Sequence, residues 1–579
     1  MPTRYSSSLV LLCALGLVAC GGGAESDNSG GNSTPPPGSP PTVSLGAAPN
    51  TVAPAGSTLL TWSSSNASSC SATGAWSGGK ATSGSQTINS IMAASIYTLS
   101  CTGSGGSTTR SATVTVGAAG TGANGAVDSS LLNRHQESAN LVYAFAGFDT
   151  TSTSGTPVAT APVTQDTGGC TFRYDLAGLP DGSYSVALTS NGGTSFRRSA
   201  NVTVAGPAAV QNFTPTRVLR VGPGKPFAHP NDVTGLVSGD VVEIDAGVYN
   251  GTETTWSTDN LTLRGVGGRA HLVAPATISN GKATWVTAGD NMAVENIEFS
   301  GATAQFSNGA GIRSEGRDLA ICGSYFHDNE NGILGNDGNG NVLIEYTEFA
   351  RNGNCNDSAG CAHNIYMGNT DRFTLRYSYS HHASSGHTVK SRAKENYILY
   401  NRIMDEADGS SSYTIDLPNG GLSYIVGNLL QQGPNTENSS ILAYGAEGLS
   451  NLSKTLYIVN NTFVNGRTAG STFVQISGGS AATATLQNNL FVGTGTIVTG
   501  GTVTQVSNLT INTAAANFVN IGAFDYRPTA ATPGIDLGTA PGLGGTFALT
   551  PIYQYVHPIN RQARPTPNAI DIGAYEYNP

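Results

Sequence analysis

Val294-Glu295-Asn296-Ile297-Glu298-Phe299 is followed 27 residues later by Ile321-Cys322-Gly323-Ser324-Tyr325-Phe326, which has the same pattern of apolar and polar positions. The first apolar residue of each copy serves as an anchor for the repeat. Further anchors, with spacings of 23 to 32 residues, follow at Ile344, Leu375, Leu399, Val426, Ile458 and Leu486. Short strands that recur at this period, separated by Asn-rich turns, predict a right-handed parallel β-helix.

Asparagine recurs at one position of this repeat. The residues concerned are Asn296, Asn401, Asn428, Asn460 and Asn488. Stacked asparagines can form hydrogen bonds along a ladder, and asparagine tolerates the backbone of tight turns. We therefore expect a structural role for this column.

The composition agrees with an all-β protein. The chain has 579 residues, of which 11% are charged, whereas a typical soluble protein has roughly 25%. The low charge argues against a helix-rich cytosolic enzyme, and 38% hydrophobic residues argue against disorder along the whole length. A net charge of −10 disfavours nucleic-acid binding, because phosphate contacts need clustered lysine and arginine.

The N-terminus predicts export. Residues 1–19 contain one early charge, Arg4, and an apolar run that is too short to span a bilayer. Leu17-Val18-Ala19-Cys20-Gly21 resembles a bacterial lipoprotein signal, which implies lipidation of Cys20; an ordinary signal peptide with a chance cysteine is the alternative. Because no Asp follows Cys20, the resemblance implies an outer-membrane lipoprotein that faces the periplasm or the cell surface. Residues 20–41 predict a flexible Gly/Ser/Pro tether.

Two small β-sandwich domains are expected before the β-helix, over residues 42–118 and 126–215. In the first, Trp62, Cys70 and Cys101 resemble a bacterial Ig-like module, which implies a disulfide between the two cysteines. Cys355 and Cys361 are expected to staple one loop, with free thiols as the alternative. Cys170 and Cys322 have no evident partner.

The flanks of the repeat carry a second resemblance. Val221-Gly222-Pro223-Gly224-Lys225-Pro226-Phe227 and Gly239-Asp240-Val241-Val242-Glu243-Ile244 are similar to the first coil of pectate-lyase-like β-helix proteins. Phe524-Asp525-Tyr526-Arg527-Pro528 and Asp571-Ile572-Gly573-Ala574-Tyr575-Glu576 resemble a common bacterial β-helix terminus. The resemblance covers residues 217–579 and implies the fold; one fold hosts many functions.

A second strand in each coil points to a functional face. Its expected inward anchors are Ile333, Ile365, Val389, Ile415 and Ile441. Because strand side chains alternate, Tyr366, Lys390 and Asp416 should stack in one outward column. Arg392 and Tyr444 should lie in the next column, with Asn364 and Thr388 also outward and His363 and His387 at the strand starts.

Charge singles out the same region. Residues 371–402 contain six Lys or Arg residues against Asp371 and Glu395, a balance of +4, and also three histidines. A cationic face of this kind suits a polyanionic sugar chain.

His387-Thr388-Val389-Lys390-Ser391-Arg392 broadly resembles the active face of β-helix polysaccharide lyases that cleave uronate-containing chains. The resemblance implies β-elimination with Lys390 as the base, Arg392 on the uronate carboxylate and Tyr366 or His387 as the acid. Asp416 would belong to the same catalytic column. The substrate-binding residues would be His363, Asn364, Thr388 and Tyr444. Calcium is an open possibility, although no acidic calcium cage or other metal site is evident; the Asn336–Asn341 stretch lacks the closing Glu of a calcium loop.

Three alternatives stay open. Asp405, Glu406, Asp408 and Asp416 could include the acid and base of an inverting glycoside hydrolase. The chain could instead be a non-catalytic glycan-binding or adhesin-type lipoprotein. Finally, Lys390, Arg392 and Asp416 could form a salt-bridge ladder without catalytic function. The expected partner is an acidic polysaccharide, and a monomer is expected.

Overall fold

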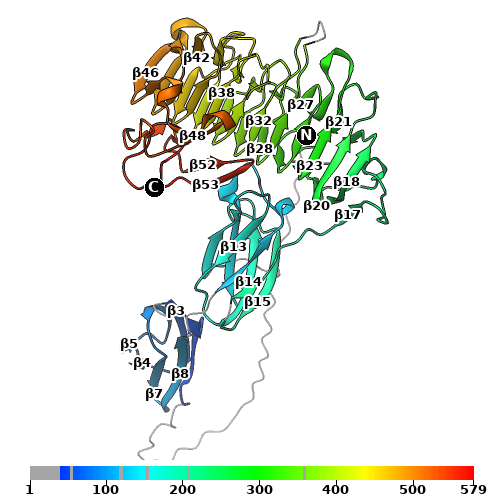
Figure 1. Ribbon diagram of the computed structural model, residues 1–579. Coiled ribbons are helices and arrows are strands. Elements are labelled where there is room, and N and C mark those ends of the chain that lie inside the picture. The colour runs from blue at the N-terminus through cyan, green and yellow to red at the C-terminus, as the bar shows by residue number, and fades with distance from the viewer. Residues whose placement is uncertain (1–38, 53–55, 117–121, 150–154, 207, 356–359) are drawn as a thin grey trace, which may run out of the picture. The chain divides into compact units, whose positions relative to one another are not determined.

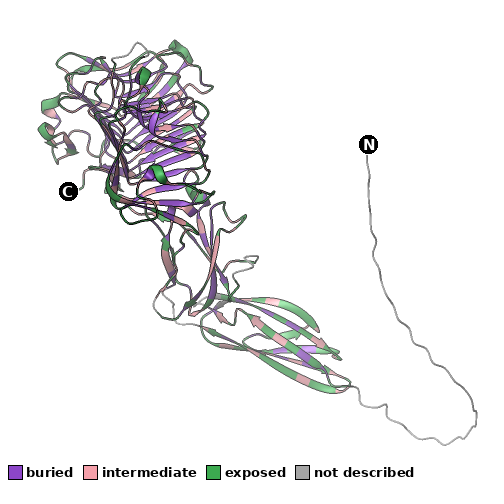
Figure 2. Cartoon of the chain, turned by 90° about the vertical axis from the view of Figure 1, so that its right-hand side faces the viewer, coloured by how far each residue is buried: buried purple, intermediate pink, exposed green. Residues whose placement is uncertain are grey.

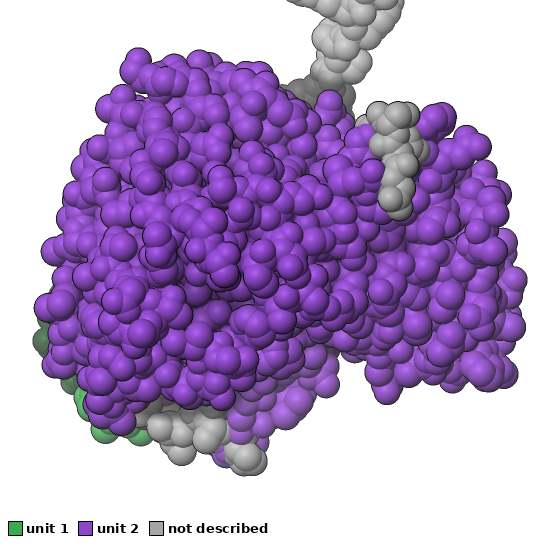
Figure 3. Space-filling model, turned by 45° about the horizontal axis from the view of Figure 1, so that its top comes forward, with its two compact units in different colours: residues 1–50, 56–115 green, residues 51–55, 116–579 purple. Residues whose placement is uncertain are grey.

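The computed structural model describes residues 39–52, 56–116, 122–149, 155–206, 208–355 and 360–579. These residues form strands and seven short 3-10 helices, with no α-helix among them. The chain divides into two compact units, residues 1–50 with 56–115 and residues 51–55 with 116–579 (Figure 3). The predicted signal, Cys20 and most of the tether lie outside the described residues. In the described part of the chain, no helix has the length and apolar character needed to cross a membrane.

The first unit is a β-sandwich. One sheet has the order β1 (Thr42–Ala48), β3 (Gly56–Ser65), β6 (Ser83–Ile91), and the other holds β8 (Gly106–Val116), β7 (Ser95–Gly103), β4 (Ser69–Gly74) and β5 (Gly78–Lys80). Trp62 packs edge-on against Trp76, with 5.3 Å between the ring centroids. Cys70 and Cys101 face each other on β4 and β7 and form the predicted disulfide.

A second β-sandwich begins the larger unit. Its sheets have the orders β11 (Ala159–Pro162), β10 (Leu141–Ala146), β14 (Gly182–Thr189), β15 (Arg198–Val204) and β12 (Thr164–Gln165), β13 (Phe172–Leu176), β9 (Ala123–Val127), β16 (Ala209–Val210). Strands β10 and β14 are the two central strands of the first of these sheets. Val142, Val186 and Leu188 are fully buried in the core.

From β17 (Val218–Val221) to Ile511 the chain is a right-handed parallel β-helix with three stacks of strands (Figure 1). The long strands β18 (Val241–Asn250) and β20 (Thr262–Val273) lead into the first two stacks. The first stack continues through β22 (Ala293–Glu295), β25 (Leu319–Cys322), β28 (Asn341–Glu345), β31 (Arg372–Arg376), β34 (Glu395–Leu399), β37 (Leu422–Val426), β40 (Thr455–Val459), β43 (Thr483–Gln487) and β46 (Thr502–Val506).

The second stack continues through β23 (Ile297–Ser300), β26 (Tyr325–His327), β29 (Glu348–Ala350), β32 (Tyr379–His381), β35 (Arg402–Met404), β38 (Leu429–Gln432), β41 (Thr462–Asn465), β44 (Leu490–Val492) and β47 (Leu509–Ile511). The third stack runs through β19 (Thr254–Trp256), β21 (Ala283–Thr287), β24 (Ala310–Ser314), β27 (Asn331–Gly335), β30 (Ile365–Met367), β33 (Val389–Ser391), β36 (Ile415–Leu417), β39 (Ser440–Tyr444), β42 (Ser471–Ile476) and β45 (Gly495–Thr499). Figure 2 shows that most of these strand residues are buried.

The predicted anchors of the first stack are correct up to Leu375, and two later anchors are wrong by one residue. Val294, Ile321, Ile344 and Leu375 pair in register, but Leu375 then pairs with Ile398, and Ile398 pairs with Ile425. Leu399 and Val426 lie outside the coil, in a cluster with tyrosines. Strand β34 ends in Ile398-Leu399 and strand β37 in Ile425-Val426. Because both residues of each pair are apolar, the alternation of apolar and polar residues does not decide which one points inward.

The predicted asparagine column is in fact two columns. Asn296, Asn460 and Asn488 have φ values of 56°, 52° and 55° and form corners where the strand turns. The internal ladder lies one residue later, where the backbone N–H and Nδ2 of Asn401 donate to Asn428 Oδ1 at 2.9 and 3.0 Å. It continues through Asn461, Asn489 and Asn508. Asparagine pairs at 460–461 and 488–489 hide this offset in the sequence.

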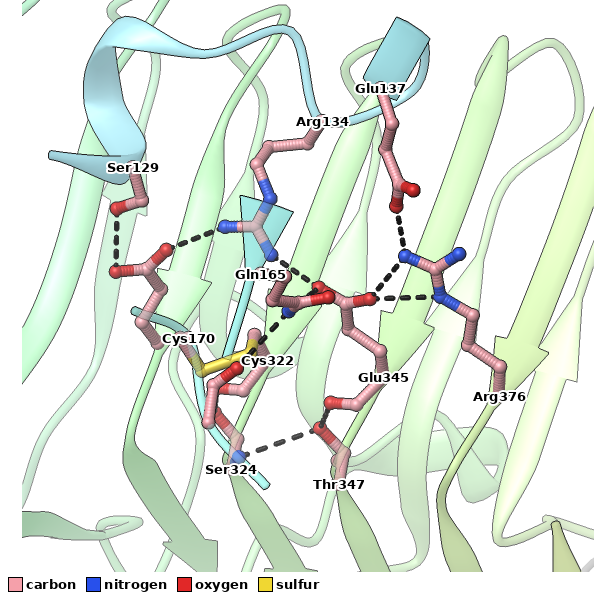
Figure 4. A network of polar contacts seen from close by, with 12 residues as sticks. Ser129, Arg134, Glu137, Gln165, Cys170, Cys322, Ser324, Glu345, Thr347 and Arg376 are labelled. Atoms are coloured by element: carbon pink, nitrogen blue, oxygen red, sulfur yellow. Dashed lines mark hydrogen bonds and ion pairs between the residues drawn. A yellow bond between two sulfur atoms is a disulfide. The ribbon is translucent and has the colours of Figure 1, made fainter. Parts of the chain in front are cut away.

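The second sandwich is fixed to the outer face of the first stack, as Figure 4 shows. Cys170, which follows β12, forms a disulfide with Cys322 of β25, and so pairs the two cysteines that the sequence left unassigned. The Arg134 guanidinium bridges Glu295 at 2.7 Å and Glu345 at 2.5 Å, and Arg376 contacts Glu345 at 2.6 Å. Burial favours a raised pKa for Glu345, but the charges of Arg376 and Arg134 outweigh it and hold the pKa at about 2.

The C-terminal segment covers further parts of the first and second stacks. Tyr553 of β52 (Tyr553–Val556) packs edge-on against Tyr377 and Tyr400, and Leu549 joins the same apolar cluster. Within the segment, Arg564 Nε lies 2.9 Å from Glu576 Oε2, and both side chains are 2% exposed. The third stack is the face that carries the predicted site.

Candidate functional site

The predicted outward column exists on the third stack. Tyr366 of β30 pairs with Lys390 of β33, and Lys390 pairs with Asp416 of β36. Parallel strands place paired residues directly above one another, about 4.8 Å apart, with their side chains on the same face. Arg392 follows β33 by one residue and lies beside this column, because its Nε donates to Tyr366 Oη at 2.9 Å.

A carboxylate that sequence reasoning missed joins the two cations. Glu447 lies in the loop after β39; its Oε1 is 2.8 Å from Lys390 Nζ and its Oε2 is 2.5 Å from Arg392 Nη2. Arg392 also donates through Nη1 to Asn419 Oδ1 at 2.7 Å. The sequence signal for Glu447 was weak, because it lies 57 residues after Lys390 and outside any strand. Lys390 and Arg392 therefore form a site that binds both oxygens of one carboxylate, and the Glu447 carboxylate occupies it.

Asp416 lies beneath this pair and is 2% exposed. Its Oδ2 is 3.7 Å from Lys390 Nζ and 3.4 Å from His387 Nε2. Its Oδ1 has no hydrogen-bond partner among the described residues. Burial raises the pKa of Asp416 to about 6, against the opposing charge of Lys390, so this carboxyl titrates in the range useful for proton transfer.

The neighbouring histidines are neutral. His363 and His387 stack with 4.8 Å between ring centroids, and His387 stacks in turn on Tyr413. Each ring accepts a backbone N–H at Nδ1: His387 from Tyr413 at 3.2 Å, and His363 from His387 at 2.9 Å. Burial, reinforced by nearby positive charge, lowers the pKa of His387 to about 3 and that of His363 well below its usual value. They therefore add no positive charge to the face.

Three of the predicted substrate-binding residues point into the coil, although the sequence predicted that their side chains point outward. Asn364 is fully buried and joins an internal ladder in which its Oδ1 accepts from Asn352 at 3.1 Å. Thr388 is fully buried, and its hydroxyl has no partner in the part of the chain that is described. Tyr444 pairs with Leu417 in the interior and donates to the Gly421 carbonyl at 2.7 Å. The cause at Tyr444 is a register slip: Leu442, and not Ile441, takes the inward position above Ile415.

The cationic stretch 371–402 does not form one patch. Its six cations point to different faces, and each pairs with a carboxylate. Arg372 and Lys394 form exposed pairs with Glu395 and Asp371 at 2.7 Å. Arg376 binds Glu345 under the second sandwich, and Arg402 binds Glu406 by the second stack. Only Lys390 and Arg392 of the six lie at the third-stack site, because successive strands of one coil face different directions.

The alternative carboxylate set does not converge either. Asp405 is fully buried and accepts from the backbone of Ser411 and Gly433 and from the Thr436 hydroxyl. Glu406 and Asp408 lie near His382 of the second stack, with Asp408 Oδ1 at 3.0 Å from His382 Nε2. Asp416, on the third stack, is therefore separated from this polar turn.

A groove adjoins the cation pair along the same face. Arg313, Leu334 and Tyr366 pair through consecutive strands and form the same outward column that continues to Lys390. They line a groove of about 540 Å³, together with Asn336, Asp337, Gly360, Cys361 and Gly368 among others. Cys355 and Cys361 form the predicted disulfide in the loop at its edge. The groove is large enough for a few sugar units, and Tyr366 in its lining contacts Arg392.

Comparisons with known proteins yield little. No protein-family model and no curated protein matches the chain. Among solved structures, the chain is similar to a chimeric titin Z1Z2 functionalised with a decorin peptide, at 12% identity over 30% of this chain and 97% of that one, with a TM-score of 0.12. It is also similar to the pectin methylesterase of Aspergillus niger, at 13% identity over 55% of this chain and 92% of that one, with a TM-score of 0.22. These TM-scores are too low to support a functional argument.

Proposed function

We propose that the chain is a carbohydrate-active protein that binds an acidic polysaccharide along the third stack and cleaves it by β-elimination. The observation that carries this proposal is the carboxylate of Glu447, held by Lys390 at 2.8 Å and Arg392 at 2.5 Å. Tyr366, whose hydroxyl accepts a hydrogen bond from Arg392, also lines the groove. A site that holds one carboxylate through a lysine and an arginine suits the carboxylate of a uronate. Glu447 is 43% exposed, so a substrate can displace it without unfolding the coil.

β-Elimination needs the uronate carboxylate to be neutralised, the C5 proton to be removed and the leaving oxygen at C4 to be protonated. Lys390 is flanked by two carboxyl groups, Glu447 and Asp416, which suits it to carboxylate binding more than to the base role implied by resemblance. We assign carboxylate binding to Lys390 and Arg392 together.

Proton transfer is assigned to Tyr366. Its hydroxyl contacts Arg392 Nε, and its ring lies 5.5 Å from Lys390 Nζ. As a phenolate, Tyr366 can take the C5 proton, while the C5–H electrons form the C4–C5 double bond and the C4–O bond breaks. The phenol formed in this way can then return that proton to the leaving oxygen on the same face of the sugar. Asp416 supports the site from below by contacting Lys390.

The test is incubation of the full chain with alginate, pectate, glucuronan and chondroitin, followed by ultraviolet absorbance of unsaturated ends. We expect Tyr366→Phe to lower kcat by about 10²-fold or more while substrate binding persists. Lys390→Ala and Arg392→Ala should weaken binding, whereas Lys394→Ala, which removes an exposed ion-paired lysine of the same coil, should have no effect. Unchanged activity in Lys390→Ala would refute the assignment.

Removal of the internal carboxylate provides a sharper test. Glu447→Gln leaves the Lys390/Arg392 pair without its anion, so we expect tighter polysaccharide binding and a lower KM. Glu437→Gln, the same substitution at an exposed position in the loop before β39, is the matched control. A weaker affinity in Glu447→Gln would show that Glu447 holds the cations in place and does not stand in for substrate.

A second candidate, glycoside hydrolysis, is favoured by one observation. Asp416 and Glu447 both contact Lys390, yet burial raises the pKa of Asp416 whereas the bonds from Lys390 and Arg392 outweigh burial and lower that of Glu447. Two carboxyls with diverging pKa values can serve as acid and base. New reducing ends without ultraviolet absorbance would favour this reaction. Binding without cleavage of any substrate would favour the adhesin-type function. From the leader pattern, we further propose an outer-membrane lipoprotein anchored through Cys20.

A further inference from the structure

A second group of functional side chains lies on the outer face of the second stack, near the N-terminal end of the β-helix. His271 of β20, Glu298 of β23 and His327 of β26 come from three consecutive coils. His271 and Glu298 are paired in register, and His327 pairs with Ser300 of β23. One ligand atom from each residue lies within 4.8 Å of the other two, and the side chains are 17 to 25% exposed.

Two of the distances in this group match those between ligand atoms around a small metal ion. Glu298 Oε1 lies 3.1 Å from His327 Nε2 and 3.5 Å from His271 Nδ1. Ligand atoms bound tetrahedrally to zinc, at about 2.0–2.2 Å from the ion, are about 3.3 Å apart. The two imidazole rings are tilted by 42° with 5.6 Å between their centroids, so they are not stacked face to face.

In each histidine, the hydrogen bond of the other ring nitrogen explains why one nitrogen faces the Glu298 carboxylate. His327 Nδ1 is 2.6 Å from Asp328 Oδ2, and because a carboxylate only accepts, Nδ1 carries the proton. In a neutral ring, Nε2 then directs its lone pair at Glu298 Oε1, which is also an acceptor. Two acceptors at 3.1 Å repel each other unless a proton or a metal ion lies between them. His271 Nε2 is likewise held by Ser300 Oγ at 2.7 Å, which leaves Nδ1 toward Glu298.

We propose that His271, Glu298 and His327 bind a divalent transition-metal ion, with zinc as the preferred occupant. Two imidazole nitrogens and one carboxylate oxygen form a ligand set that suits zinc, and partial exposure leaves room for water as the fourth ligand. Asp328 and Ser300 orient the imidazoles from outside, as partners of metal-bound histidines commonly do. The competing arrangement is an imidazolium of His327 shared between Asp328 and Glu298, without any ion.

The test is a calorimetric zinc titration of the full chain after removal of metals with a chelator. We expect about one equivalent to bind, with a rise in melting temperature and, with cobalt in place of zinc, visible absorption of a tetrahedral site. Glu298→Gln should abolish the rise, and Asp328→Asn should weaken binding about 10- to 100-fold. Glu315→Gln, a surface carboxylate paired with Lys282, should bind zinc as the wild type does.

The outcomes separate cleanly. Absence of saturable zinc uptake by the wild type, or an undiminished zinc-dependent rise in melting temperature in Glu298→Gln, would overturn the proposal. The melting temperature of Glu298→Gln in chelator shows whether that variant folds. If it does not fold, the affinity of Asp328→Asn decides, because that residue lies outside the ligand set and a wild-type affinity there would refute the oriented site.

Discussion

At the scale of single residues, Asp416 has the most distinctive environment on the third stack. It is buried beneath Lys390, and its pKa is raised from 3.8 to about 6. A raised folded-state pKa means that the neutral form favours folding. The stability that this group contributes is complete below about pH 4 and is lost as the pH rises through about 6.

We therefore predict that Asp416→Asn changes the pH dependence of stability. The free energy of unfolding of the variant, relative to that of the wild type, should rise by up to about 3 kcal/mol between pH 4 and pH 7. The shift with pH is the diagnostic, because loss of the Lys390 contact adds an offset. Thermal unfolding midpoints across this range measure it. Parallel curves for the two proteins would show that Asp416 titrates normally.

At the scale of the coil, the internal asparagine ladder is the element that sets strand register in the later coils. Asn428 accepts from Asn401 and donates to Asn461 Oδ1 and the Ile398 carbonyl, with no exposed surface. Because a hydrophobic anchor pair such as Ile425-Val426 fits either register, the ladder supplies the discrimination that apolar burial does not.

We predict that Asn428→Ala destabilises the β-helix by about 1–3 kcal/mol, since it leaves buried groups of Asn401 and Ile398 without partners. The unfolding midpoint in urea measures the change. Asn435→Ala, at an exposed asparagine of the neighbouring loop, should leave the midpoint unchanged. Equal effects of the two substitutions would mean that the ladder adds no stability beyond that of a surface asparagine.

At the scale of the whole larger unit, the second sandwich and the β-helix are held together by buried charges and a disulfide. Glu345 accepts from Arg134, Arg376 and Gln165 and is 1% exposed. Its pKa of about 2, against 4.5 for a free glutamate, means that its contribution is present above about pH 4.5 and is lost as the pH falls through about 2. The sandwich therefore covers part of the first stack, and the groove lies on the third stack.

We predict that Glu345→Gln destabilises the larger unit by about 3–5 kcal/mol near neutral pH, because Arg134 and Arg376 lose the charge that both face. The variant should also lose less stability than the wild type between pH 4.5 and pH 2. Thermal unfolding with limited proteolysis of the sandwich measures both effects. Glu437→Gln, at an exposed position, should follow the wild-type curve throughout.

Local patterns determined much of this protein. The repeat period, the anchors up to Leu375 and the column of Tyr366, Lys390 and Asp416 follow from apolar alternation and coil length. These features depend on side chains a few residues apart or one coil apart, so the local pattern suffices to predict them. The Cys355–Cys361 pair follows from proximity along the chain, and the Cys70–Cys101 pair was implied by the Ig-like resemblance.

The tertiary structure decided everything that joins distant segments. Glu447 reaches Lys390 and Arg392 from a loop, Cys170 meets Cys322 across 152 residues, and His271, Glu298 and His327 meet only because three coils stack in register. Residues 371–402 show the converse, because one cationic stretch is spread over three faces. Coil turns redirect neighbouring side chains and stacking aligns distant ones, so the repeat predicts the β-helix while the docking of loops and domains determines the sites on it.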